Sequence, residues 1–184
     1  MSMRGRIAQI RPLAAVIGLT ILMPSGALAG VTHLEVPVRG MTCALCTRGV
    51  EESIKSLGGV SATADLAGAR VRVEAADGRT LVVRDIRERI LSAGFGIGGE
   101  VDATAAGRFL IGPDRRITFR VASGAYTFQV LESDMLRRLF KKSPGLKGEF
   151  VLRFRLHDHP HWKPPAISIT DFEPRTPAPA PQGK

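Results

Sequence analysis

Residues 40–46 read GMTCALC, and this short stretch contains both cysteines of the 184-residue chain. Two sulfurs that lie two residues apart can bind a metal ion, form a reactive disulfide, or form an inert structural disulfide. Two cysteines are too few to build a disulfide-stabilised scaffold, so a hydrophobic core must hold the fold together. The segments on either side of this stretch therefore decide which fold presents the two thiols.

The segment before the cysteines has the pattern of a strand, and the segment after them has the pattern of a helix. Residues 33–39 alternate between polar and apolar side chains, which predicts a half-buried strand. After the cysteines, Val50, Ile54 and Leu57 recur at helical spacing, and the glycines at 58–59 end the predicted helix. The cysteines are thus expected in the loop between a strand and the start of a helix.

Two more strands and a second helix follow. Residues 60–66 and 70–75 alternate as strands, and Val83, Ile86 and Ile90 give a second amphipathic helix.

A last strand is expected through residues 97–101. The order βαββαβ over residues 30–102 predicts a ferredoxin-like domain, in which both helices cover one face of an antiparallel four-stranded sheet.

The rest of the chain is expected to be mostly β. Residues 103–107 (ATAAG) read as a linker, and residues 108–173 contain four alternating segments and one amphipathic helix at 134–142. They predict a small β-rich domain, either a barrel or a curled sheet, that is loosely similar to an oligonucleotide- or oligosaccharide-binding barrel; this likeness by itself implies no ligand. The fold class is therefore α+β, and the Pro/Ala-rich residues 174–184 are predicted to form an extended, disordered tail.

The start of the chain has the pattern of a secretory signal. Residues 1–29 combine three arginines, an apolar run at 12–23 and a final Ala-x-Ala, which predicts a cleaved signal peptide and a periplasmic or secreted protein. An uncleaved membrane anchor is the alternative. The formal charge is +9, or +6 without those three arginines. We expect no nucleic-acid partner, because the predicted export argues against one.

The predicted position of the cysteines favours metal binding. Cys43 would directly precede the helix and Cys46 would lie in its first turn, where free N–H groups and the helix dipole favour thiolate over thiol. Two thiolates suit a soft cation, Cu(I) or Hg(II), and suit Zn(II) less well, because zinc usually takes four ligands. Disulfide exchange and a structural disulfide stay open as alternatives.

Several motifs together resemble the heavy-metal-associated domain family. The stretch 40–46 is followed by Val-Glu at 50–51 and Gly-Gly-Val at 58–60, and Ala-Gly-Phe at 93–95 is similar to the family's Ala-Gly-aromatic corner. The resemblance covers residues 31–102. The family includes copper chaperones, the amino-terminal modules of copper- and zinc-pumping ATPases, and the periplasmic mercury-binding protein.

This resemblance implies specific roles for named residues. It implies that Cys43 and Cys46 bind the metal and that Phe95 packs beside their loop. It also implies a metal donor or acceptor protein as partner, including a membrane metal transporter, and we expect a monomer. Met41 is a flexible apolar side chain, which favours a packing role over that of a thioether ligand.

A second metal site is a further hypothesis. His157, His159 and His161 alternate, and imidazole suits Cu(II), Zn(II) or Ni(II). A polar loop broken by Pro160 is the alternative reading of this segment.

The sequence carries no pattern of an enzyme. It has no nucleophile elbow, no phosphate-binding glycine loop and no zinc-protease helix motif. We expect a binding protein, or alternatively an interaction module whose β-rich part carries the main role. The basic pairs at 137–138 and 141–142 are typical of a solvated face, and weak contact with an anionic membrane surface is the alternative.

Overall fold

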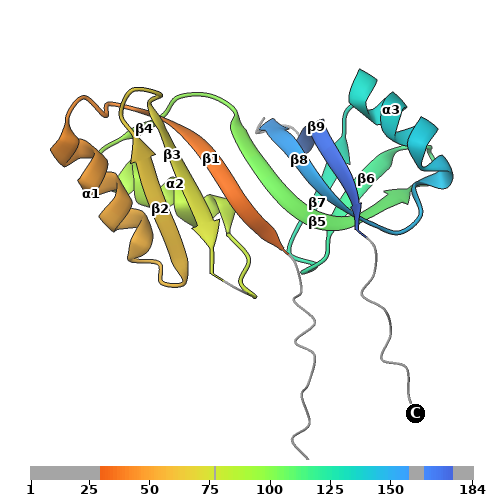
Figure 1. Ribbon diagram of the computed structural model, residues 1–184, viewed down its shortest axis with the longest axis horizontal. Helices are drawn as coiled ribbons and strands as arrows, with labels where there is room; N and C mark the ends of the chain where they lie inside the picture. The colour runs from red at the N-terminus through yellow and green to blue at the C-terminus, as the bar shows by residue number, and fades with distance from the viewer. Residues whose placement is uncertain (1–29, 77, 158–163, 176–184) are drawn as a thin grey trace, which may run out of the picture.

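The computed structural model describes residues 30–76, 78–157 and 164–175 (Figure 1). The predicted signal peptide at 1–29 lies outside these residues. The elements are, in chain order, β1 (Val31–Arg39), α1 (Ala44–Lys55), β2 (Val60–Asp65), β3 (Arg70–Ala75), α2 (Val83–Ser92), β4 (Gly96–Ile97), β5 (Val101–Ile111), β6 (Ile117–Val121), β7 (Thr127–Val130), α3 (Asp134–Lys142), the 3₁₀ turn η1 (Pro144–Leu146), β8 (Glu149–His157) and β9 (Ala166–Arg175). No helix in this described part of the chain is both long and apolar enough to cross a membrane.

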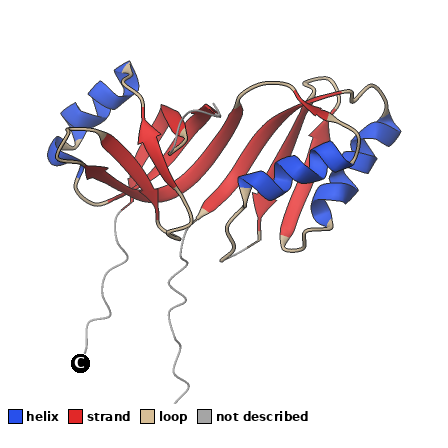
Figure 2. Cartoon of the chain, turned by 180° about the vertical axis from the view of Figure 1, so that it is seen from behind, coloured by secondary structure: helices blue, strands red, loops and turns tan. Residues whose placement is uncertain are grey.

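The first half has the predicted ferredoxin-like arrangement. Strand β1 lies between β3 and β5, with β2 at the free edge beyond β3, and these pairings are antiparallel. Helices α1 and α2 both cover the same face of this sheet (Figure 2). Val50 and Ile54 of α1 and Ile86 and Ile90 of α2 are fully or almost fully buried, so the predicted apolar stripes are the ones that pack on the sheet.

The fourth strand position differs from the prediction. Strand β4 contains only Gly96–Ile97, which pairs with the end of β1, and β5 takes over as the neighbour of β1 from residue 102 onward. The expected strand at 97–101 is therefore wrong in its bounds. Gly98 and Gly99 lie between the two strands, and the Gly98 N–H donates to the Pro37 carbonyl of β1.

The linker expected at residues 103–107 is also wrong, because these residues lie in the middle of β5. Ala103, Ala105 and Ala106 are buried between the neighbouring strands β1 and β8. Small side chains fit this position, which has a neighbouring strand on either side. A run of small residues without large apolar side chains is also typical of a flexible linker, so the sequence pattern does not distinguish the two.

The second half closes into a barrel. Strands β5, β6, β7, β9 and β8 follow one another, and β8 pairs with β5 again, so these five described strands form a closed ring. Only the β7–β9 pairing is parallel among them. Helix α3 connects β7 to β8. The five strands form a barrel that shares β5 with the first half and follows no linker, so the separate β-rich domain expected at residues 108–173 stays a prediction.

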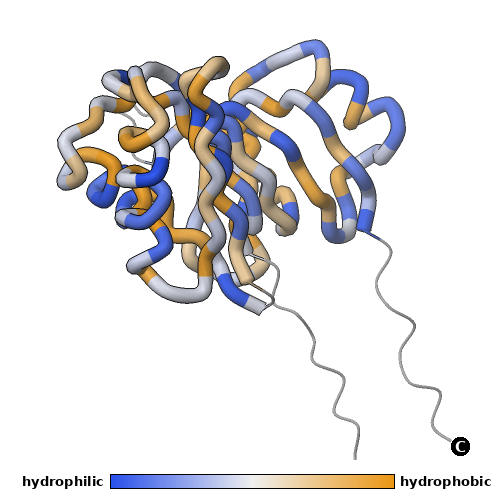
Figure 3. The backbone as a smooth tube through the Cα atoms, turned by 60° about the vertical axis from the view of Figure 1, so that its left-hand side comes forward, coloured by the Kyte–Doolittle hydropathy of each residue, from blue (hydrophilic) through white to orange (hydrophobic). Residues whose placement is uncertain are grey.

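Aromatic side chains fill the barrel. Phe109, Phe119, Phe128, Phe150 and Phe154 are all buried, and the Phe109 ring lies 5.2 Å from Phe119 and 5.3 Å from Phe150. Apolar and polar positions alternate along the strands, as the hydropathy colouring of the chain shows (Figure 3). The barrel strands are therefore held by a packed core. Strand β9 continues to Arg175, so residues 174 and 175 do not belong to the predicted tail, whose other residues lie outside the described part of the chain.

Polar contacts cross the junction between the two halves. On the helix-free face, Arg70 of β3 lies 3.4 Å from Asp102 of β5, and Asp102 in turn lies 3.1 Å from Arg155 of β8. On the helical side, the Val83 N–H at the start of α2 donates to the Tyr126 hydroxyl next to β7. Exposed ion pairs contribute little stability each, so the two halves are joined mainly by the backbone pairing of β5 with β1 and β8.

Gly107 marks the point where β5 leaves β1 and begins to pair with β6. A Cβ atom at this position would collide with the Arg120 carbonyl oxygen and with the Phe119 ring. We predict that Gly107→Ala lowers the free energy of unfolding by about 1–3 kcal/mol, because either the backbone at Arg120 or the Phe119 ring must move to make room for the methyl group. Urea unfolding followed by circular dichroism measures this.

Gly49 offers the matched control for this substitution. It lies in α1 with open space around it, so Gly49→Ala should raise stability by up to about 1 kcal/mol through helix propensity. Equal stability of Gly107→Ala and the unmodified protein would contradict the close approach at β5.

The free edge of the sheet is protected by a carboxylate. The Ala64 N–H of edge strand β2 donates to Glu51 Oε1 at 2.8 Å, and the Lys55 ammonium lies 3.0 Å from the other carboxylate oxygen. The hydrogen bond from Ala64 lowers the pKa of Glu51 from its ordinary value, partial burial opposes this effect, and Lys55 adds to it. The ionised glutamate thus occupies an edge N–H that would otherwise be free to pair with another strand.

We predict a pH-dependent effect of Glu51→Gln. Because the pKa of Glu51 is lower in the folded than in the unfolded state, its carboxylate stabilises the fold above about pH 4.3, the value of an unperturbed glutamate. At pH 7 the variant should be less stable by roughly 0.5–1.5 kcal/mol, the net value of one hydrogen bond. The difference should shrink as the pH falls through the lowered pKa. Thermal unfolding at several pH values tests this, and a difference that grows toward acid would contradict it.

Candidate metal centre

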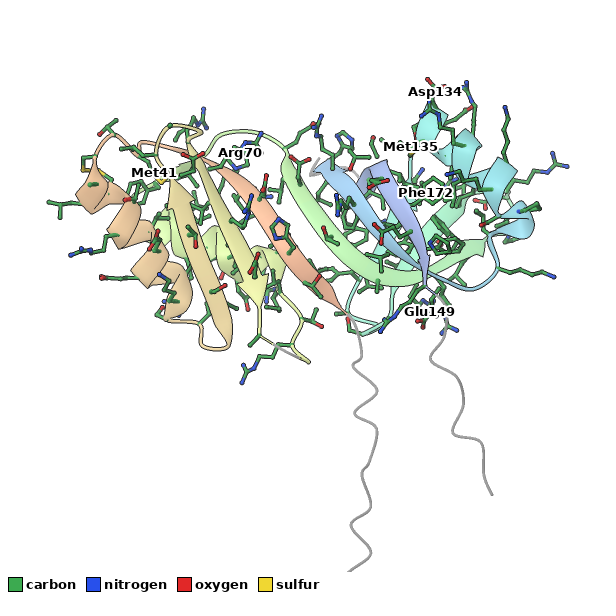
Figure 4. All side chains as sticks on the ribbon, in the orientation of Figure 1. Met41, Arg70, Asp134, Met135, Glu149 and Phe172 are labelled. Atoms are coloured by element: carbon green, nitrogen blue, oxygen red, sulfur yellow. A yellow bond between two sulfur atoms is a disulfide. The ribbon has the colours of Figure 1, made fainter. Side chains whose placement is uncertain are left out.

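The cysteine loop begins where β1 ends. Gly40 has φ +94, a left-handed conformation that favours glycine and turns the chain away from the strand. Met41 then returns to the core and is only 6% exposed. In Figure 4 the labelled Met41 lies at the end of the sheet that carries the start of α1. The loop is thus fixed at its base by one glycine and one buried side chain.

Cys43 is the N-cap of α1. The Cys46 N–H donates to Cys43 Sγ at 3.1 Å, so the Cys43 sulfur takes the place of the usual capping oxygen. The Thr47 hydroxyl donates to the Ala44 carbonyl within the same turn. The first turn of α1 contains no acidic residue, and its N–H groups therefore favour negative charge on the sulfurs when the pair is reduced.

The sulfurs of Cys43 and Cys46 are joined by a disulfide in the structure, with their Cα atoms 5.1 Å apart. The Cys43 side chain is exposed, Cys46 is half-buried, and Leu45 between them is 77% exposed. A metal ion or a second protein can therefore approach the pair from solvent. The oxidised pair cannot offer two thiolates, so metal binding at this loop requires its reduction.

Phe95 lies at the base of the loop. A Cβ atom on Gly40 would be 3.7 Å from Phe95 Cδ1, which places the ring against the first residue of the loop. The Phe95 N–H donates to the Ile90 carbonyl at the end of α2, and the half-buried ring packs on the hydrophobic core. The ring thus packs beside the loop, as the family resemblance implies.

The histidine hypothesis concerns the end of β8. His157 is 17% exposed, with Nδ1 2.6 Å from Glu100 Oε1 and Nε2 2.8 Å from the Ser168 hydroxyl. Both ring nitrogens are therefore engaged by these two side chains. His159 and His161 lie outside the described residues, so their part of the hypothesis stays a prediction. Among the residues that the structure describes, no group of three or more potential ligands could hold a metal ion.

The family model described as heavy-metal-associated domain matches residues 35–96, which run from β1 through α2 to the start of β4. Residues 35–96 are therefore a heavy-metal-associated domain. This domain is a metal-binding module, and both cysteines lie within the matched residues. The match ends before β5, so the barrel lies outside it.

Three solved structures are similar to the heavy-metal-associated domain. The CopZ metallochaperone is 26% identical, with a TM-score of 0.34; the match covers 36% of this chain and 100% of CopZ. A copper binding domain from a P-type ATPase is 35% identical, with a TM-score of 0.33; the match covers 37% of this chain and 95% of that domain. A putative copper-ion-binding protein from Bacillus anthracis is 30% identical, with a TM-score of 0.32; the match covers 38% of this chain and 96% of that protein. None of the curated proteins compared with the chain matches it.

Two features of the site were not anticipated from the sequence. Leu45 is exposed between the cysteines, although a leucine near a helix start usually packs inward. The helical spacing could have revealed it, because Leu45 lies off the face defined by Val50 and Ile54. The partners of His157, Glu100 and Ser168, are distant in sequence and carry no local signal that pairs them with it.

Substitution of Met41 separates a packing role from a ligand role. Met41→Leu should keep stability within about 1.5 kcal/mol, whereas Met41→Ala should lower it by about 2–4 kcal/mol, because the side chain is buried. Both variants should bind the same number of Cu(I) ions as the unmodified reduced protein. Loss of Cu(I) from Met41→Leu, measured by competition with a chromophoric chelator, would identify the thioether as a ligand.

Proposed function

We propose that the chain is an exported metal-binding protein that captures one soft metal ion between Cys43 and Cys46 and passes it to a partner protein. The single observation that supports this most strongly is the position of both sulfurs at the start of α1, where Cys43 is exposed and Cys46 is half-buried. The heavy-metal-associated domain at residues 35–96 supports metal binding by this part of the chain. Export is inferred from residues 1–29 alone.

Binding begins with the reduced pair. A dithiol reductant transfers two electrons to the Cys43–Cys46 disulfide and becomes a disulfide itself, which leaves two thiols on the loop. The metal ion then binds both sulfurs, and the thiol protons are released to solvent. The N–H groups at the start of α1, including the one that Cys46 donates to Cys43 Sγ, stabilise the negative charge that the sulfurs then carry.

Transfer proceeds by exchange of sulfur ligands. A thiolate of the partner adds to the bound ion, one of the two cysteines leaves and takes up a proton, and a second exchange releases the ion. The exposed Cys43 and Leu45 leave room for a partner at this end of the molecule. A metal donor or acceptor, including a soluble module of a membrane metal transporter, fits this chemistry.

Cu(I) is the preferred ion in this proposal. It is soft and accepts two thiolates, whereas Zn(II) usually takes four ligands. Hg(II) also accepts two thiolates and is the second choice. The chain offers no further cysteine that would complete a four-sulfur zinc site.

We predict that the reduced protein binds one Cu(I) per chain and that the Cys43→Ser/Cys46→Ser variant binds none at this site. Both sulfur ligands are lost in the variant, while the exposed loop should keep the fold intact. Titration of residues 30–184 with Cu(I) under anaerobic conditions, followed by native mass spectrometry, counts the ions. The matched control is Ser53→Ala on the same helix, which leaves the loop unchanged and should bind one ion.

The disulfide in the structure supports a second candidate, a thiol–disulfide exchange protein. Such a protein would reduce insulin with catalytic turnover and would lose this activity in the double variant. Catalytic turnover together with absent Cu(I) binding would overturn the metal proposal in favour of this one. Tight Cu(I) binding without turnover would exclude the exchange function.

A further inference from the structure

Charge is distributed unequally between the two halves of the chain. Residues 30–100 carry nine basic and nine acidic side chains, whereas residues 101–175 carry thirteen basic and eight acidic ones. The half with the cysteine loop is therefore neutral, and the half with the barrel has a net charge of +5. Such an asymmetry produces a field that acts on charged partners at one end only.

Most of this excess lies on one short segment. Residues 133–148, which contain α3 and η1, carry five basic side chains and one acidic side chain. Leu136, Leu139 and Leu146 of this segment point into the core and are buried. Its basic side chains are all exposed, and we call them the α3 basic surface: Arg137, Arg138, Lys141, Lys142 and Lys147.

Only part of this charge is neutralised within the protein. Arg137 forms ion pairs with Glu132 and Asp134, and the Lys142 ammonium lies 5.6 Å from the centre of the Phe172 ring. No ion pair within the described residues reaches Arg138, Lys141 or Lys147.

Further arginines border the same surface. Arg115 and Arg116, in the loop before β6, line a hollow of about 420 Å³ together with Arg137 and Phe140 of α3. Arg116 is paired with Asp114. The positive field of the α3 basic surface therefore extends past the helix onto the barrel.

The α3 basic surface and the cysteine loop lie at opposite ends of the molecule. In Figure 1 the start of α1 and helix α3 stand at the two ends of the long axis. Asp134 and Met135, labelled on α3 in Figure 4, are at the end away from Met41. A partner that covered α3 would therefore leave the two sulfurs accessible.

We propose that the α3 basic surface docks the protein on a bilayer that contains anionic phospholipid. Exposed lysines and arginines on a convex helix complement a negatively charged membrane surface. The leucines of α3 are already used in the barrel core, so the contact is electrostatic and does not insert into the acyl chains. It must therefore weaken steeply as salt screens the charges.

Single-stranded nucleic acid fits this surface less well. Proteins that bind it without sequence preference stack bases on exposed aromatic side chains. The large hydrophobic side chains that are exposed among the described residues are all aliphatic: Leu45, Leu66, Val82, Leu91 and Ile111. The membrane proposal is independent of metal binding, because it uses no residue of the cysteine loop.

Cosedimentation with vesicles tests the proposal directly. Residues 30–184 are mixed with vesicles of phosphatidylcholine alone, or of phosphatidylcholine and phosphatidylglycerol in equal parts. We expect binding to the mixed vesicles only, and release when the salt concentration is raised. Arg138→Gln/Lys141→Gln should bind roughly 25-fold more weakly, about fivefold for each lost charge, and Arg138→Glu/Lys141→Glu more weakly still.

The control places the same charge change in the other half. Arg48→Glu/Arg89→Glu alters two exposed helix residues and should bind within about twofold of the unmodified protein, because these residues lie away from α3. Circular dichroism verifies that each variant is folded. Unchanged binding of Arg138→Glu/Lys141→Glu, equal binding to phosphatidylcholine alone, or binding of a single-stranded oligonucleotide but of no vesicle would overturn the proposal.

Discussion

Strand β5 is the constraint on which the rest of the structure depends. Its first half pairs with β1 on one side and with β8 on the other, and its second half pairs with β6. The ferredoxin-like half and the barrel therefore share one continuous set of backbone hydrogen bonds. The ion pairs from Arg70 through Asp102 to Arg155 follow the same path across the strands. Because β5 fixes both halves, the cysteine loop and the α3 basic surface are held at opposite ends of one body.

The chemistry of the cysteine loop follows from its place at the start of α1. Cys43 caps the helix through its sulfur, and no acidic side chain in the first turn opposes the partial positive charge of the N–H groups. The buried Met41 and the ring of Phe95 hold the base of the loop, while Leu45 remains in solvent. A fixed base and an exposed tip fit the proposed capture of an ion and its transfer to another protein.

Much of this arrangement could be predicted from the sequence, because the relevant signals are local. Helical spacing found α1, α2 and α3, and the glycines and cysteines around residues 40–46 placed the loop between β1 and α1. The middle of β5 could not be recognised as a strand, because Ala103, Ala105 and Ala106 lack the large apolar side chains that mark one. Their burial depends on the neighbouring strands β1 and β8, which come close only in the folded chain. The alternation and the imidazole chemistry of the histidines predict a metal site that includes His157, whereas its contacts with Glu100 and Ser168 depend on strand register and have no local signal.

The most direct test of the account is X-ray absorption spectroscopy of the reduced protein loaded with one equivalent of Cu(I), without added thiol. If Cys43 and Cys46 alone hold the ion, the first coordination sphere contains two sulfur atoms and no nitrogen. Nitrogen ligands in that sphere, or a spectrum unchanged when both cysteines are replaced by serine, would contradict the account and move the site to the histidines.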